Sequence, residues 1–141
     1  MLQVVFIGLG LFAPIGEIGR VIPLGSKLTC SCEYWEIGRF SSDISADVVS
    51  FSDNTLYINA YHYTQRVKIR TFKDLNLVAG AGWYFISEEL NGNLDKDKGA
   101  CSFAGLNFPF CSEGKQFLSC EALYYTVPRG VSLTLNFGFK L

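Results

Sequence analysis

The residues that most resemble catalytic groups are His62 and Thr64, because the only histidine of the chain stands two positions before a hydroxyl. In acyl transfer a histidine activates a hydroxyl nucleophile, and a carboxylate orients the histidine. Residues two apart on a strand share a face, and we expect both to point outward with Leu56, Ile58 and Ala60. No Asp or Glu on a neighbouring strand can be assigned to the third role. The favoured interpretation is an interfacial histidine among tyrosines, so no catalytic residue is predicted.

Cysteines and glycines are the next residues that could do chemistry. The five cysteines are Cys30, Cys32, Cys101, Cys111 and Cys120. Because the count is odd, at least one thiol is free or pairs outside the chain. Cys30 and Cys32 lack the CxxC spacing, and one histidine cannot complete a zinc set, so no metal site is predicted. Gly80-Ala81-Gly82 lies within an expected strand and precedes no helix, so it is no phosphate loop and no cofactor is predicted.

Composition limits the class of protein. The 141 residues carry 12 Lys+Arg and 13 Asp+Glu, with 49% hydrophobic and only 18% charged residues. This balance gives no reason to expect a nucleic-acid partner and excludes intrinsic disorder. The length predicts one domain over residues 1–141. The longest charge-free stretch, residues 1–16, contains three glycines and a proline, which a membrane-spanning helix would tolerate poorly.

The hydrophobic periodicity is close to two throughout and predicts an all-β chain of eight antiparallel strands joined as hairpins. The expected strands are Gln3–Ala13, Lys27–Ile37, Ile44–Ser52, Thr55–Lys68, Leu75–Ile86, Ala100–Phe110, Gln116–Val127 and Val131–Leu141. Turn-forming residues separate them, including a break over Gly38–Asp43. The two longest connections are expected to be loops over Pro14–Ser26 and Glu88–Gly99.

Each strand divides into an apolar face and a face of small or polar residues. Six glycines all fall on the face opposite the apolar one: Gly8, Gly10, Gly80, Gly82, Gly105 and Gly138. A soluble barrel would turn the apolar face inward and would need Lys, Glu and Asp at the outward positions. Those positions instead carry Gly, Asn, Thr and Ser with isolated charges. The inverted arrangement, an eight-stranded up-and-down transmembrane β-barrel with a packed lumen, fits better.

This arrangement assigns a place to many side chains. Candidates for a polar network in the lumen are Glu33, Glu121, Asn76, Asn107, Asn136 and Lys140, with Arg39 and Arg129 near strand ends. The expected lipid-facing residues are Leu75, Leu77, Leu106, Phe108, Leu133, Leu135, Phe137 and Phe139. Aromatic residues near strand ends are expected to form interfacial girdles; they are Tyr34, Trp35, Trp83, Tyr84, Phe85, Tyr124, Tyr125 and Phe139.

Specific motifs support the same fold. Residues 8–16 read Gly-Leu-Gly-Leu-Phe-Ala-Pro-Ile-Gly, and the last strand alternates from Leu133 to Leu141. With Glu33-Tyr34 near the end of the second expected strand, they resemble, over essentially the full length, the small outer-membrane β-barrel proteins of Gram-negative bacteria. That group contains OmpX and the OmpA transmembrane domain. Members usually end in Phe and seldom carry thiols, whereas this chain ends in Leu141 and has five cysteines.

The resemblance implies a location in the bacterial outer membrane. The implied partners are membrane lipid, the insertion machinery that reads the last strand, and an extracellular surface partner held by the loops. Residues 1–3 lack a basic segment and no Ala-x-Ala pattern follows, so we expect that any secretory signal has been removed from this chain.

Three functions follow from these observations. The favoured one is a non-enzymatic outer-membrane barrel with a structural or surface-interaction role. A soluble β-barrel that binds a small apolar ligand in its interior is the first alternative. The second is a membrane esterase resembling the lipid A deacylases, which use a membrane-facing His with a Ser two residues on. Thr64 stands in the place of that Ser, and Gln65 stands where those enzymes usually have Asn.

Overall fold

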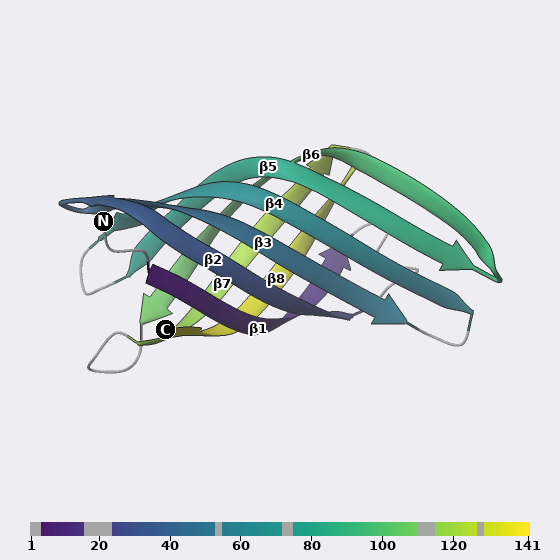
Figure 1. Cartoon of the computed structure of the whole chain (residues 1–141), viewed down its shortest axis with the longest axis horizontal. Coiled ribbons are helices and arrows are strands. Elements are labelled where there is room, and N and C mark those ends of the chain that lie inside the picture. Colours follow the sequence, from purple (N-terminus) through teal and green to yellow (C-terminus); the bar gives the residue numbers. More distant parts are fainter. Residues whose placement is uncertain (1–3, 16–23, 53–54, 72–74, 110–114, 127–128) are drawn as a thin grey trace.

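The eight strands form a closed antiparallel barrel in which each strand pairs with its neighbours in sequence and β1 pairs with β8 (Figure 1). The computed structural model describes residues 4–15, 24–52, 55–71, 75–109, 115–126 and 129–141. The strands are β1 (Val4–Ile15), β2 (Gly25–Ile37), β3 (Phe40–Ser52), β4 (Leu56–Arg70), β5 (Asn76–Leu90), β6 (Asn93–Pro109), β7 (Gln116–Thr126) and β8 (Arg129–Lys140). The prediction of eight antiparallel hairpin-connected strands is therefore confirmed. Among these residues no helix is long and apolar enough to cross a membrane.

The turns differ from the expected connections at two places. A two-residue turn at Gly38 and Arg39 replaces the longer expected break, and β3 begins at Phe40. The expected loop over Glu88–Gly99 is wrong, because β5 and β6 stay paired up to a tight turn at Asn91 and Gly92. Both turn residues have positive φ, 50° and 83°, as the two-residue turns that match strand twist require.

The paired ends of β5 and β6, with the start of β4 beside β5, extend beyond the other strands, and we call residues 87–98 the projecting hairpin (Figure 1). It lies at the end of the barrel opposite the two chain termini, which we call the loop end. From Glu89 to Lys98 every residue is exposed. Charged residues made this segment look like a loop, but charges on solvated faces do not prevent strand pairing.

Burial alternates along the strands with the small and polar face inward. On β8, Ser132, Thr134 and Asn136 are buried, whereas Leu133, Leu135 and Phe137 are exposed on the outer face. Of the expected lipid-facing residues, only Leu75 and Leu106 are half-buried. The outer surface therefore carries the apolar band that the inverted arrangement predicts.

On β4 the expected orientation is wrong. Leu56, Ala60, His62 and Thr64 are buried inside the barrel, and the tyrosines between them are exposed on the outer face. The outward assignment followed the aliphatic residues. At the loop end, however, the lumen is itself apolar, and tyrosine rings suit an outer face near water.

The aromatic residues expected to form girdles also divide between the two faces. Trp35, Trp83, Phe85, Tyr124 and Phe139 are exposed. Tyr34 is half-buried, and its hydroxyl lies 2.5 Å from the side-chain nitrogen of Gln65, which donates to it. Tyr84 and Tyr125 are buried in the lumen, so for these two the girdle assignment is wrong.

Inward glycines leave room for large side chains. A Cβ at Gly80 would lie 2.6 Å from the Phe103 ring, and one at Gly105 would lie 2.7 Å from the Glu121 side chain. At Gly138 it would overlap the ring of Phe117. The glycines thus allow the lumen of a narrow barrel to be filled by side chains from the facing strands.

Candidate functional site in the lumen

Charged side chains inside the barrel form a connected ion-pair cluster toward the end where the chain termini lie. Its members are Lys27, Glu33, Asp43, Asp47, Arg66, Lys68 and Glu121. They come from β2, β3, β4 and β7, and on each strand they occupy inward positions. Burying a single unpaired charge costs folding free energy, whereas buried charges of opposite sign can be tolerated as pairs. The stability of the cluster therefore depends on how completely its members are paired.

Arg66 is the centre of the cluster. Its Nε lies 2.6 Å from Asp43 Oδ1, and its Nη1 lies 3.4 Å from Glu121 Oε1. Asp43 has no exposed surface, and its other oxygen lies 2.7 Å from Lys68 Nζ. The two cations on β4 thus share one fully buried carboxylate on β3, their direct neighbour in the sheet.

Lys27 connects the same cluster to the other side of the barrel. Its Nζ lies 3.2 Å from Asp47 Oδ2 and 3.4 Å from Glu121 Oε2. Ser45 donates a hydrogen bond of 3.0 Å to Asp47. Glu121 therefore bridges Lys27 and Arg66, so charges on strands that are far apart in sequence meet across the lumen.

Aromatic rings cover the cations from the remaining directions. Lys68 Nζ lies 4.4 Å from the centre of the Phe6 ring, and the Arg66 guanidinium lies 5.8 Å from that of Phe103. Phe6 packs edge-on against Phe117 at 5.6 Å between ring centres. These contacts add cation–π attraction and close the space beside the ion pairs.

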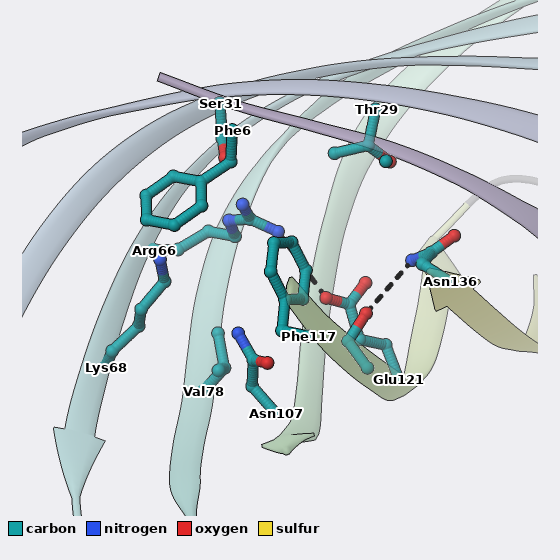
Figure 2. A pocket seen from close by; sticks show the side chains of 12 residues that line it. Phe6, Thr29, Ser31, Arg66, Lys68, Val78, Asn107, Phe117, Glu121 and Asn136 are labelled. Atoms are coloured by element: carbon teal, nitrogen blue, oxygen red, sulfur yellow. Dashed lines mark hydrogen bonds and ion pairs between the residues drawn. The ribbon is translucent and has the colours of Figure 1, made fainter. Parts of the chain in front are cut away.

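A small cavity of about 20 Å³ lies beside the cluster (Figure 2). It is lined by Phe6, Gly8, Thr29, Ser31, Arg66, Lys68, Val78, Asn107, Phe117, Ser119, Glu121 and Asn136. Such a volume holds about one water molecule, whereas pockets for small molecules are on the order of 300–1,000 Å³. This cavity is too small for an apolar ligand of the kind that the soluble-barrel alternative requires.

The expected lumen residues lie in different places. Glu33 and Glu121 belong to the ion-pair cluster, and Asn107 and Asn136 line the cavity, where Asn136 donates to Ser119 at 3.3 Å. Asn76 is half-buried at the start of β5. Lys140 and Arg39 are exposed at the terminal end and lie outside the cluster. The side chain of Arg129 lies outside the described residues.

Five members of the cluster were missed by the analysis of the sequence: Lys27, Asp43, Asp47, Arg66 and Lys68. A signal was available, because charged residues recur on one face of a strand: Asp43 and Asp47 are four apart with Ser45 between them, and Arg66 and Lys68 are two apart. Once such a run is placed on the inward face, the opposite charges of neighbouring strands must meet.

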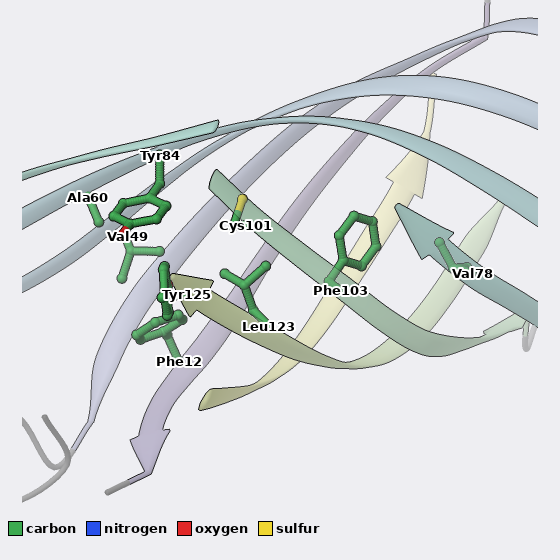
Figure 3. Packing of buried hydrophobic residues seen from close by; sticks show 9 residues of the cluster. All are labelled: Phe12, Val49, Ala60, Val78, Tyr84, Cys101, Phe103, Leu123 and Tyr125. Carbon is green, nitrogen blue, oxygen red and sulfur yellow. The ribbon is translucent and has the colours of Figure 1, made fainter. Parts of the chain in front are cut away.

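A second group, the aromatic cluster, lies mainly toward the loop end of the lumen, while its members Val78 and Phe103 reach the level of the ion-pair cluster (Figure 3). It contains Phe12, Val49, Ala60, Val78, Tyr84, Cys101, Phe103, Leu123 and Tyr125. Tyr84 meets Tyr125 edge to face at 5.0 Å between ring centres. His62 adjoins this cluster: its Nε2 forms a hydrogen bond of 2.9 Å with the Tyr125 hydroxyl, and its ring stacks on Phe12 at 6.3 Å.

These contacts overturn the outward placement of the candidate acyl-transfer pair. His62 and Thr64 are both buried on the inner face, with 1% and 4% of their surfaces exposed. The outer face of β4 therefore carries no His62–Thr64 pair. Inside the barrel, His62 forms its hydrogen bond with Tyr125.

The cysteines give no cluster either. Cys30 and Cys120 are exposed on the outer face, Cys32 is half-buried and Cys101 is buried, and all four are free thiols. Cys111 lies outside the described residues. Within the described part of the chain, no three His, Cys, Asp or Glu side chains come together in a way that could hold a metal ion.

Comparison with known proteins gives similarity in structure alone. No family model matches the chain, and no curated protein matches its sequence. The attachment invasion locus protein Ail of Yersinia pestis is 14% identical with a TM-score of 0.69, covering 100% of both chains. The N-terminal β-barrel domain of Pseudomonas aeruginosa OprF is 13% identical with a TM-score of 0.66, covering 99% of this chain and 100% of that one.

A third similar structure is Neisserial surface protein A, which is 12% identical with a TM-score of 0.64 and covers 99% of this chain and 96% of that one. Ail has also been solved with the heparin analogue sucrose octasulfate and in a phospholipid bilayer nanodisc. At these identities the likeness concerns the fold. The chain therefore has the fold of the small eight-stranded outer-membrane β-barrels, as its sequence predicts.

Proposed function

We propose that this chain is a non-enzymatic integral outer-membrane β-barrel whose loop end contacts partners outside the cell. The observation that carries the proposal is the division of side chains between the two faces of the sheet. Lys27, Asp43, Asp47, Arg66 and Glu121 are buried in the lumen, while large apolar residues cover the outer face. A chain folded in water would gain more from the opposite division.

The filled lumen supports a structural or surface role over transport. The ion-pair cluster and most of the aromatic cluster occupy successive levels of the barrel, and the cavity between the side chains of the charged level is water-sized. Enclosure of His62 against Tyr125 supports the non-enzymatic assignment. The projecting hairpin supports contact with partners, since exposed segments on a rigid scaffold usually carry recognition. The similar protein Ail was solved with a heparin analogue, which makes sulfated polyanions a reasonable first class to try.

The test is refolding with and without detergent, followed by gel migration before and after boiling. We expect a compact band that shifts on boiling only when micelles or vesicles are present, because the outer apolar band needs lipid or detergent. A soluble, monomeric, β-rich protein in plain buffer would contradict the proposal and favour the soluble-barrel alternative. Conductance across a planar bilayer tests the lumen separately, and we expect no stable open channel.

A further inference from the structure

The outer face of β4, β5 and β6 forms an open groove at the loop end, with a volume of about 580 Å³. It is lined by Asn59, Tyr61, Phe85, Ile86, Ser87, Lys96, Asp97 and Lys98. The groove lies on the same side of the sheet as the apolar band.

The strand register places one lysine beside the aromatic residues and a second lysine one row beyond them. One row across the three strands consists of Tyr61, Phe85 and Lys98. The next row toward the tip of the projecting hairpin consists of Asn59, Ser87 and Lys96. The row on the other side contains Trp83, whose side chain is 64% exposed. Successive rows on one face are about 7 Å apart along the strand. Lys98 therefore lies one row beyond Trp83 along the strands, and Lys96 lies two rows beyond it.

The outer face of the projecting hairpin carries two lysines and one carboxylate, Glu89, which lies one row beyond Lys96. Lys96 and Lys98 point to the outer side, and the alternation of the strand directs Asp95 and Asp97 to the other side. Within the described residues, neither lysine side chain takes part in an ion pair. The side-chain oxygen Oδ1 of Asn59 accepts a hydrogen bond of 2.9 Å from the Ser50 hydroxyl, which leaves the side-chain NH₂ group of Asn59 as a donor beside the groove.

We propose that this groove binds the phosphate-bearing headgroup of an anionic membrane lipid in the leaflet at the loop end. The inference rests on the proposed membrane insertion and names a lipid class that the barrel selects. Exposed Trp and Tyr side chains settle at the headgroup level of a bilayer. Lysines just beyond them meet lipid phosphates at short range, where attraction to anionic headgroups is strongest.

The aromatic wall favours a lipid over a soluble polyanion. Phe85 and Tyr61 share a row with Lys98 and lie between Lys96 and the apolar band, so a ligand in the groove meets ammonium groups toward one end and aromatic rings toward the other. A lipid has that same polarity along its length. A soluble sulfated saccharide would use the lysines and leave the rings without a partner.

The two tryptophans of the chain supply a matched pair of reporters. Trp83 lies beside the groove, whereas Trp35 is exposed near the terminal end of β2. Trp35→Phe leaves fluorescence from the groove alone, and Trp83→Phe leaves fluorescence from the opposite end alone. Each variant is reconstituted in vesicles of phosphatidylcholine and phosphatidylglycerol, with bromine placed on one lipid or the other. The ratio of quenching by the two brominated lipids measures which lipid each tryptophan meets.

At Trp83 we expect brominated phosphatidylglycerol to quench about threefold more than its mole fraction predicts. Lys96→Gln with Lys98→Gln should bring this ratio to that of phosphatidylcholine and leave the ratio at Trp35 unchanged. The matched control, Lys115→Gln with Lys140→Gln, removes the same charge at the opposite end and should leave Trp83 unchanged.

Four results would overturn the inference. Equal quenching at Trp83 by both lipids would show that the groove selects no headgroup, and so would a preference that survives the double Lys variant. Loss of the preference on adding a soluble sulfated oligosaccharide would assign the groove to a soluble polyanion. Trp83 quenched by neither lipid would overturn membrane insertion itself, whereas quenching without preference would overturn the lipid site alone.

Discussion

The ion-pair cluster and the aromatic cluster fill the same narrow lumen by different physical means. In the former, Asp43 is shared by Arg66 and Lys68, so every member depends on the charge of another. In the aromatic cluster, the rings of Tyr84 and Tyr125 pack edge to face, and the Tyr125 hydroxyl forms a hydrogen bond with His62. The first arrangement is vulnerable to the loss of one charge. The second is vulnerable to a change in volume.

The difference teaches how the barrel can be charged inside and apolar outside. Charges that enter the lumen leave water almost completely, so they persist only where neighbouring strands present opposite signs at the same level. The rings need no such matching, because they gain from contact with any neighbour that fits. The ion-pair cluster therefore fixes strand register more strictly than the aromatic cluster.

The largest effect is expected from Asp43→Ala. Removing this carboxylate leaves Arg66 and Lys68 buried with weaker partners, and we expect unfolding in vesicles to become easier by about 3–5 kcal/mol. Equilibrium unfolding in urea, followed by tryptophan fluorescence, measures the change. Ser45→Ala on the same inner face of β3 is the control, with an expected cost of about 1 kcal/mol. Equal costs for the two variants would show that the shared charge contributes little.

A smaller effect is expected from Gly82→Ala, which tests packing at the level of the aromatic cluster. A Cβ at Gly82 would overlap the carbonyl oxygen of Tyr63 and lie 2.7 Å from the Cα of Thr64. These are backbone atoms, which cannot move away by a change of rotamer. We expect destabilisation of about 1–3 kcal/mol. Gly8→Ala is the matched control, since its nearest contact is 3.5 Å. If Gly8→Ala costs as much in the same unfolding assay, crowding is not the cause.

The sequence predicted the strand number and the alternation of β8, because its outer face is Leu and Phe and its inner face is Ser, Thr, Asn and Gly. It failed on β4, where aliphatic residues line the lumen and tyrosines face outward. Apolarity alone cannot orient a strand whose two faces are both hydrophobic over half its length. The pairing of Arg66 with Asp43 settles the orientation, and that pairing appears only once β3 and β4 are in register.

The projecting hairpin escaped prediction for a related reason. Its strands carry alternating acidic and basic residues, which water solvates on both faces, so no apolar periodicity marks them. The Asn91-Gly92 turn was the available signal, because that dipeptide favours a two-residue hairpin whatever the flanking polarity.

The smallest effect is expected from Tyr125→Phe, which removes one hydroxyl and keeps the ring. The His62 Nε2 then loses its partner at 2.9 Å, while the edge-to-face contact with Tyr84 remains. We expect a cost of about 1 kcal/mol in urea unfolding, the usual range for one buried hydrogen bond. Tyr84→Phe keeps the hydrogen bond between Tyr125 and His62 and serves as the control for losing a hydroxyl elsewhere in the cluster. A cost for Tyr125→Phe near that of Asp43→Ala would mean that polar pairing governs both ends of the lumen, and the contrast between the two clusters would fail.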